Sequence, residues 1–258
     1  MNADQHIKTI SNWINNYARK SKCLTLVVGI SGGIDSSVVS TLCAMTGLST
    51  IVVSMPIKQR RDLHKLSLAH GQWLTERYDN VKHLTINLTP TFNKFAELFK
   101  DNENMLALAN SRSRLRMTTL YQIAQSNNGL VVGTGNRVED FGVGFFTKYG
   151  DGGVDISPIG DCSKTQVWAI GQRLELLKDI IDAVPTDGLW DDGRTDEQQL
   201  GMSYAELELA MQQDESNQRV IDAKPKQNLI KYREIRSRNL HKMQAIPVCT
   251  LKNARPDL

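Results

Sequence analysis

The chain has 258 residues, of which 40% are hydrophobic and 23% charged, and its formal net charge at pH 7 is +3. The length allows a full buried core, the composition is typical of a soluble globular protein, and the charge alone is too small to indicate nucleic-acid binding. We find no apolar export signal and no run long enough to span a membrane, so we expect no membrane partner. The four cysteines are scattered without CxxC spacing, which predicts reduced thiols in the cytoplasm.

The first half of the chain shows short apolar runs that alternate with helical patterns. Ile7, Ile10 and Ile14 recur at helical spacing and predict an amphipathic helix near the start of the sequence. Strands are expected over 24–30, 50–56, 81–87 and 129–134, and helices over 38–42, 62–78, 92–99 and 104–126. Strands alternating with helices of this length imply parallel βαβ units, so we predict an α/β fold, three-layer α/β/α with a parallel sheet.

The second half is expected to elaborate this sheet. Residues 135–158 are rich in glycine and follow a strand, which places them at the carboxyl edge where open α/β sheets bind ligands. Helices are expected over 165–177, 203–213 and 226–240, and the acidic, turn-rich stretch 185–199 is predicted to be a mobile lid. No linker divides the chain. We therefore predict one domain over 1–258, with a nucleotide-binding core at 24–135 and the substrate loop, lid and C-terminal helices at 136–258.

The first predicted strand runs into the turn Ser31-Gly32-Gly33-Ile34-Asp35-Ser36-Ser37, where a helix begins. Adjacent glycines let the backbone bend sharply, and the first turn of a helix carries unpaired N–H groups and the positive end of the helix dipole. Such a turn suits a phosphate or pyrophosphate, and the carboxylate of Asp35 suits Mg²⁺. Considered alone, the segment could also be a glycine-rich turn with serine caps and no ligand.

Several motifs resemble those of one family. The turn resembles the SGGxDS loop of the PP-loop ATP pyrophosphatases. Residues 110–117 (NSRSRLRM) resemble the NxxARLRM segment of the NAD synthetases, 132–139 (VGTGNRVE) their GTGNxxE, and 145–158 (FFTKYGDGGVDISP) their FTKYGDGGxDxxP block. The remaining matches follow in the family's order: Lys164 to Val167, Pro185-Thr186, Asp196-Glu197 and His241-Lys242. The resemblance covers most of the chain from Gly29 to Pro247 and implies the PP-loop (adenine nucleotide α-hydrolase-like) ATP pyrophosphatase fold.

This resemblance implies an ammonia-dependent NAD synthetase, a ligase that forms a C–N bond in the last step of NAD biosynthesis. The carboxylate of deamido-NAD (nicotinic acid adenine dinucleotide) attacks the α-phosphorus of ATP to give an acyl-adenylate and pyrophosphate, and ammonia then displaces AMP. The family also implies Mg²⁺ as cofactor, ATP as co-substrate and a homodimer whose interface contributes to the substrate site. Only 23 residues precede the first predicted strand, so we expect no glutaminase domain and the use of free ammonia.

The family's functional residues carry over to four groups of residues. Asp35 and Lys164 are the expected catalytic residues, and Asp35 and Glu139 are the expected metal ligands. The expected ATP contacts are Gly29, Ile30, Ser31, Gly32, Gly33, Ile34, Asp35, Ser36, Thr134, Lys164 and Thr186. The expected deamido-NAD contacts are Arg114, Lys148, Asp155, His241 and Lys242.

The sequence departs from the family pattern at two points. The segment between Glu139 and the FTKYG block is one residue longer than the commonest family spacing, so the second metal carboxylate could be Glu139 or Asp140. Ser113 stands where the family usually has alanine, and we expect this change to be tolerated.

Three alternatives remain at this level. The loop alone also fits another PP-loop adenylating enzyme, such as a GMP synthetase ATPase subunit or a tRNA-modifying enzyme, or a module that binds ATP without turnover. A tRNA enzyme needs a wide basic surface. The basic residues of the last helix spread over several faces and are interrupted by Glu234, so we interpret them as a solvated face and expect no nucleic-acid partner: Lys231, Arg233, Arg236, Arg238 and Lys242.

The helix 104–126 is a candidate dimer interface or simply core, because it is rich in apolar residues: Leu106, Leu115, Met117, Leu120 and Tyr121.

Overall fold

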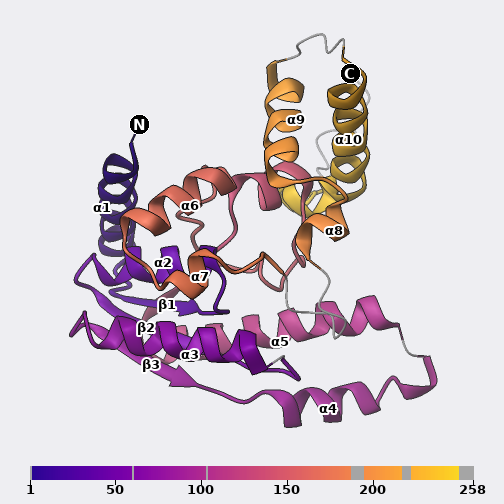
Figure 1. Cartoon of the computed structure of the whole chain (residues 1–258). Coiled ribbons are helices and arrows are strands. Elements are labelled where there is room, and N and C mark those ends of the chain that lie inside the picture. The colour runs from indigo at the N-terminus through magenta and orange to yellow at the C-terminus, as the bar shows by residue number, and fades with distance from the viewer. Residues whose placement is uncertain (1, 60, 103, 187–194, 217–221, 250–258) are drawn as a thin grey trace, which may run out of the picture.

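The computed structural model describes residues 2–59, 61–102, 104–186, 195–216 and 222–249 (Figure 1). Within these residues, four parallel strands form one sheet in the order β3-β2-β1-β4. The strands are β1 (Thr25–Gly29), β2 (Ser49–Ser54), β3 (Val81–Thr85) and β4 (Gly129–Val132). Each lies within a residue of its predicted range, or inside it. The central pair β1 and β2 is buried on both faces, which explains the nearly continuous apolar runs in its sequence.

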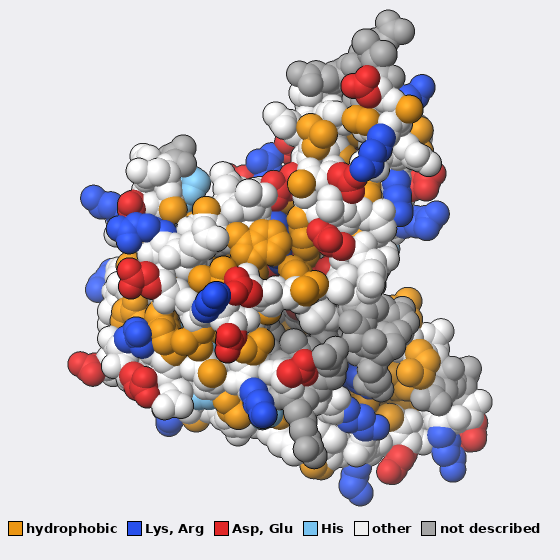
Figure 2. Space-filling model, viewed as in Figure 1, with side chains coloured by type: hydrophobic (Ala, Val, Ile, Leu, Met, Phe, Trp, Pro, Cys, Tyr) orange, Lys and Arg blue, Asp and Glu red, His pale blue; other side chains and the backbone are white. Residues whose placement is uncertain are grey.

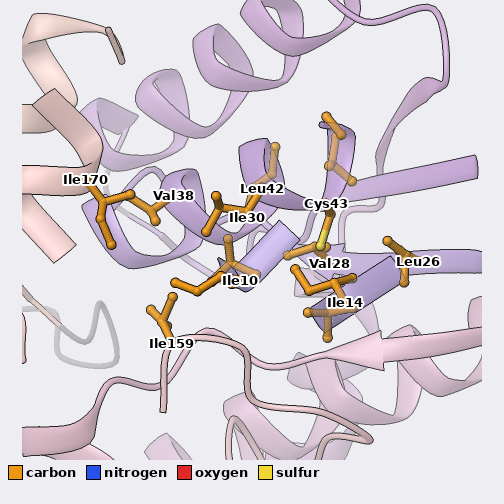
Figure 3. Close-up of a cluster of buried hydrophobic side chains, with 14 of the residues drawn as sticks. Ile10, Ile14, Leu26, Val28, Ile30, Val38, Leu42, Cys43, Ile159 and Ile170 are labelled. Atoms are coloured by element: carbon orange, nitrogen blue, oxygen red, sulfur yellow. The ribbon is translucent and has the colours of Figure 1, made fainter. Parts of the chain in front are cut away.

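One face of the sheet packs against α1 (Ala3–Ser21), α2 (Ile34–Ala44), α3 (Arg61–Thr75), α6 (Lys164–Arg173) and α7 (Lys178–Ile181). Figure 3 shows Leu26 and Val28 of β1 facing Ile14 of α1 and Cys43 of α2 in this layer. Burial of each such aliphatic side chain contributes roughly 1.5–3 kcal/mol. The layer therefore fixes the place where α2 and α6 begin, next to the carboxyl edge of the sheet.

The other face is covered by α4 (Thr89–Glu97) and α5 (Met105–Ser126), with the short 3₁₀ helix η1 (Lys100–Asn102) between them. Val27, Ile51 and Val131 point to this side, while their strand neighbours point to the first face, as strand alternation requires. The three-layer α/β/α arrangement predicted from the sequence is thereby confirmed.

A smaller cluster lies beside the sheet. The π-helix η2 (Arg137–Val143) follows β4, and the chain later forms α8 (Asp196–Leu200), α9 (Tyr204–Ser216) and α10 (Ala223–Met243). In Figure 1, α9 and α10 run side by side as a hairpin that stands away from the sheet. Val138 and Val143 of η2 pack with Leu207, Met211 and Tyr232 of this hairpin. One face of η2 thus belongs to this second core.

Two features differ from the sequence expectation. The helix predicted over 165–177 ends at Arg173, because Glu175 takes a positive φ of 54° and the N–H of Leu176 donates back to the carbonyl of Gly171. The stretch 137–143, expected to be irregular, is helical. Most of the predicted lid, 187–194, lies outside the described residues; after it, Thr195 and Gln198 form a capping box that starts α8. Among the described helices, none combines the length and apolar character that a membrane span requires.

Candidate active site

The glycine turn connects the end of β1 to the start of α2. Gly32 adopts a φ of +92°, a conformation that favours glycine, and Gly33 is the N-cap of α2 and has no side chain to cap it. The serines brace the turn from within: the N–H of Gly33 donates to Ser31 Oγ (3.1 Å), and Ser37 Oγ donates to the carbonyl of Gly33 (2.9 Å). This is the geometry expected for a backbone cradle at a helix N-terminus that accepts an anion.

Beside this turn, Lys164 joins the two expected metal carboxylates. Its ammonium lies 2.5 Å from Asp35 Oδ2 and 2.9 Å from Glu139 Oε1, and its side chain is only 2% exposed. Ser163 caps α6 in a capping box with Gln166, which makes Lys164 the first residue of that helix. Long side chains point back toward the helix N-terminus, so this position directs Lys164 to the sheet edge. The structure therefore brings the two expected catalytic residues into direct contact.

Asn136 fixes the carboxylates relative to each other. It is fully buried and is the N-cap of η2: its Oδ1 accepts from the N–H groups of Val138 and Glu139, and its Nδ2 donates to Asp35 Oδ1 (3.1 Å). One amide thus links the start of η2 to the start of α2. Sequence reasoning placed Asn136 in a motif but gave it no role.

The π-helix η2 lies where the segment between Glu139 and the FTKYG block is one residue longer than the family spacing, and a π-helix accommodates an additional residue within a helical turn. Glu139 reaches Lys164, whereas Asp140 packs over the backbone of Gly135, where a Cβ would lie 1.8 Å from Asp140 Oδ2. Of the two carboxylates left open by the sequence, Glu139 is therefore the one that shares a cation with Asp35.

Burial and charge act against each other in this cluster. Burial alone lowers the pKa of the Lys164 ammonium, but Asp35 and Glu139 outweigh it and raise that pKa, so Lys164 is charged. Burial would raise the pKa of Glu139, yet Lys164 and the hydrogen bond from Tyr204 lower it overall. Burial raises the pKa of Asp35, against the opposing effect of Lys164, and Glu139 adds to the rise. Two carboxylates thus share one ammonium.

Tyr204 and Asp196 complete the cluster and were missed as interacting groups. The Tyr204 hydroxyl donates to Glu139 Oε1 (2.5 Å) and lies 3.3 Å from Asp196 Oδ2. In the sequence, Asp196 belongs to a family motif that assigns it no contact, and Tyr204 belongs to none of the quoted motifs. A weak signal was available, since Ser203 and Glu206 have the spacing of a capping box and place Tyr204 at the start of α9.

The other expected ATP contacts lie at the same edge or next to undescribed residues. Thr134 is half-buried and follows β4 by two residues, directly before the segment that carries Asn136 and Glu139. Thr186 is also half-buried and is the last described residue before 187–194. Their roles toward ATP stay predictions.

Four of the five expected substrate contacts gather around residues 146–149. Lys148 Nζ donates to the carbonyl of His241 (2.8 Å), and Lys242 Nζ donates to the carbonyl of Phe146 (2.7 Å). Arg114 Nε donates to the carbonyl of Lys148 (3.3 Å). The end of α10, the loop and α5 are thus joined by a set of cationic side chains.

Asp155, the fifth expected substrate contact, makes hydrogen bonds that serve the sheet. Its Oδ2 accepts from the N–H of Val131 (2.8 Å) and its Oδ1 from the hydroxyl of Tyr121 (3.0 Å). It therefore holds α5 and β4 together, and a role toward substrate stays a prediction.

Ser113, which departs from the family's usual alanine, has a defined role in the structure. Its Oγ donates to Asp151 Oδ1 (2.7 Å) and accepts from the N–H of Asp151 (2.8 Å). Thr147 adds a hydrogen bond to Asn110 Oδ1 (2.7 Å), also on α5. The loop 147–151 is consequently docked onto α5 by hydroxyl groups.

The basic residues of α10 are used within the fold. Arg233 pairs with Asp214 (2.6 Å), Lys231 donates to the carbonyl of Gly201 (3.0 Å), and Arg236 donates to the carbonyls of Phe141 and Gly142 at the end of η2. On the face shown in Figure 2, the hairpin carries acidic and basic side chains together. This supports the interpretation as a solvated face rather than a continuous basic surface for nucleic acid.

The donor set fits a nucleotide-bound Mg²⁺. Mg²⁺ is usually held by one or two carboxylates together with substrate phosphates, rather than by a complete protein cage. Within the described residues, no three His, Cys, Asp or Glu side chains converge as a cage. Asp35 and Glu139 nevertheless converge on one cation, the ammonium of Lys164, at the glycine turn.

Comparison with known proteins identifies relatives across nearly the whole chain. The family model described as NAD synthase matches residues 6–246. An NH(3)-dependent NAD(+) synthetase of Carboxydothermus hydrogenoformans is 35% identical over 227 residues, which are 86% of this chain and 90% of that protein. One of the same name from Archaeoglobus fulgidus is 33% identical over 98% of this chain and 99% of its own length. The solved structure of NMN synthetase from Francisella tularensis superposes with a TM-score of 0.86 at 30% identity, covering 96% of this chain and 99% of that one.

Proposed function

This chain belongs to the NAD synthase family, and from its site we propose that it is an ammonia-dependent ligase that amidates deamido-NAD at the expense of ATP. The reaction passes through an acyl-adenylate and releases pyrophosphate and AMP. The observation that carries the proposal is the contact of Lys164 with Asp35 and Glu139 beside the glycine turn. An adenylating enzyme needs this combination of backbone donors, a cation and metal-binding carboxylates where pyrophosphate departs.

The roles follow from the positions of the groups. The turn Gly29 to Ser36 binds the departing pyrophosphate through the N–H groups of the first turn of α2, which begins at Ile34. Lys164 offers its ammonium to the same phosphates. Asp35, Glu139, Lys164 and Tyr204 all lie in the first turns of helices, whose positive dipole ends favour a polyanion. Asp35 and Glu139 would hold Mg²⁺, and the ion would supply positive charge that stabilises the leaving group.

The acid substrate is assigned to the cluster around residues 146–149. Arg114, Lys148, His241 and Lys242 supply cationic or hydrogen-bonding groups for the phosphates and the carboxylate of a pyridine nucleotide. Holding that carboxylate against the α-phosphorus of ATP supplies the proximity that a poor nucleophile needs.

A second candidate substrate is nicotinate mononucleotide. The observation that favours it is the match to the NMN synthetase of Francisella tularensis over 96% of this chain. The two substrates share the nicotinate carboxylate on which the chemistry takes place and the ribose and phosphate attached to the ring, so the same groups serve either reaction.

A homodimer is also proposed. Of the α5 residues expected at an interface, Leu115, Leu120 and Tyr121 pack against the sheet core, which agrees with the alternative of core packing. Leu106, however, is 58% exposed, and Leu98 at the end of α4 is 77% exposed, which supports a partner at that end of the two helices. Analytical ultracentrifugation at micromolar concentration tests this, and a monomer contradicts it.

A cytoplasmic location is proposed as well. The free thiols of the four cysteines support it: Cys23, Cys43, Cys162 and Cys249.

Turnover assays with single acids test the proposed function. Purified protein is incubated with ATP, Mg²⁺ and ammonium chloride, together with deamido-NAD, nicotinate mononucleotide or xanthosine monophosphate. We expect AMP and pyrophosphate in equal amounts with deamido-NAD, and glutamine in place of ammonium should support no amidation. Product only from the mononucleotide favours the second candidate. Product only from xanthosine monophosphate, or no turnover with any acid, contradicts both.

A further inference from the structure

We propose that Tyr204 is a positioning residue for the metal–ATP complex. Its hydroxyl holds one oxygen of the Glu139 carboxylate and so sets the orientation in which that carboxylate meets the metal. The inference rests on the proposed function, because it takes Asp35 and Glu139 as the metal carboxylates. It adds a residue that lies 65 positions from Glu139 in the sequence and that belongs to no motif discussed above.

The backbone of Tyr204 is fixed by the groups that start α9. The N–H of Tyr204 donates to Glu197 Oε1 (2.9 Å). On its N-terminal side, Ser203 and Glu206 exchange hydrogen bonds as a capping box, in which the N–H of Ser203 donates to Glu206 Oε2 (3.0 Å) and the N–H of Glu206 donates to Ser203 Oγ (3.3 Å). The first residue of α9 therefore has a defined place relative to α8.

The side chain of Tyr204 is held against α6. Glu208, one helical turn further along α9, accepts from both the N–H (2.9 Å) and the Oγ1 (2.8 Å) of Thr165 at the start of α6. This clamp brings the Tyr204 ring edge-on against Trp168, with ring centroids 5.8 Å apart, and within 4.8 Å of Lys164 Nζ. Only 3% of Tyr204 is exposed, so its hydroxyl has few positions available.

The Tyr204 hydroxyl is directed at the carboxylate of Glu139, one of the two proposed metal ligands. Glu139 Oε1 accepts from both Tyr204 and Lys164, which approach from different elements and fix the rotation of the carboxylate about its last bond. Metal-ligating carboxylates are themselves hydrogen-bonded, and loss of such an outer partner typically costs 10- to 100-fold in metal affinity or activity. The ring alone provides the packing against Trp168 and Lys164. The hydroxyl and the ring thus have separable roles.

Tyr204→Phe separates these roles, because it removes the hydroxyl and keeps the ring. The matched control is Tyr232→Phe: Tyr232 is also buried and belongs to the neighbouring core, but its hydroxyl faces the carbonyl of Gly142 (3.4 Å) rather than a carboxylate. Thermal unfolding of both variants establishes that they are folded before binding is measured.

Binding of Mn²⁺ to the enzyme with α,β-methylene-ATP, followed by electron paramagnetic resonance, measures the metal site without turnover. We expect Tyr204→Phe to weaken Mn²⁺ about 10-fold or more, and Tyr232→Phe to stay within about twofold of the wild type. Affinity for the metal-free nucleotide should change little. In a Glu139→Gln background, Tyr204→Phe should cause no further loss, because its effect acts through that carboxylate.

Three results overturn the inference in distinguishable ways. If Glu139→Gln weakens Mn²⁺ but Tyr204→Phe does not, Tyr204 has no positioning role and the proposed metal site stands. If neither Glu139→Gln nor Asp35→Asn weakens Mn²⁺, the metal site itself is wrong and the inference falls with it. A loss of the same size in Glu139→Gln and wild-type backgrounds also refutes the inference, because the effect then bypasses Glu139.

Discussion

Replacing the buried His70 should reduce the loss of stability at acid pH. His70 lies on α3, is fully buried, stacks on Trp73 (5.7 Å between centroids) and has its Nε2 2.8 Å from Ser40 Oγ on α2. Burial lowers its pKa to about 3, and the nearby His83 adds to this effect. In the unfolded chain the imidazole regains a pKa of about 6.5. The unfolded state therefore binds a proton first as pH falls below that value, while folded His70 stays neutral.

The size of the effect follows from proton linkage. A pH of 5 lies about 1.5 units below the unfolded pKa, and each unit is worth about 1.36 kcal/mol. Protonation of His70 in the unfolded state therefore lowers the free energy of unfolding by about 2 kcal/mol at pH 5. Above the unfolded pKa the cost disappears. The cost is thus absent near pH 7.5 and grows as the pH falls from about 6.5 toward the folded pKa of about 3.

Urea unfolding of the wild type and His70→Gln at pH 7 and pH 5 measures this contribution. Glutamine retains a group that can hydrogen-bond Ser40 but does not titrate. We expect the free energy of unfolding of the wild type to fall by about 2 kcal/mol more than that of the variant over this interval. The absolute stability of the variant does not matter, because the comparison is between two pH dependences. Equal dependences, within about 0.5 kcal/mol, would refute the assignment of a buried neutral imidazole.

Three further substitutions probe the site. Asp35→Asn removes a charge from the Lys164 cluster rather than a packing group, so turnover should fall by about 100-fold or more while circular dichroism stays native; a near-normal rate removes Asp35 from the metal site. Lys148→Ala removes the ammonium that joins the loop to His241, so the KM for deamido-NAD should rise more than the KM for ATP, and the opposite pattern in steady-state kinetics reassigns it. Ser113→Ala deletes two hydrogen bonds to Asp151 and should lower the free energy of unfolding by about 1–3 kcal/mol in urea titrations; no change would mean that the loop docks without them.

The parts of the fold that depend on local pattern could be read from the sequence. Strands β1, β2 and β4 were predictable because each is a short, nearly continuous apolar run, as buried parallel strands require, whereas β3 (Val81–Thr85) is mixed in polarity and only partly buried. The glycine turn was predictable because adjacent glycines and a following helix leave few other backbone paths. The family motifs also identified Asp35, Glu139 and Lys164, which the structure brings together.

What could not be read depends on contacts between distant segments. A π-helix has no periodicity of its own that a short sequence could display, so the extra residue before the FTKYG block signalled only an irregularity. Tyr204 reads as one more core aromatic at the start of a helix, and its hydrogen bond to Glu139 depends on how α9 packs on α6. The early end of α6 depends on a left-handed glutamate at position 175, a conformation that non-glycine residues adopt uncommonly.

The adenylation step is tested most directly by the fate of one oxygen atom. In the proposed reaction a carboxylate oxygen of the acid attacks the α-phosphorus of ATP, and ammonia then attacks the carboxyl carbon and expels AMP that retains this oxygen. Deamido-NAD labelled with ¹⁸O in its carboxylate, turned over with ATP and ammonium and followed by mass spectrometry, should give AMP that carries one ¹⁸O and pyrophosphate that carries none. Label in orthophosphate or pyrophosphate, with AMP unlabelled, would contradict the account.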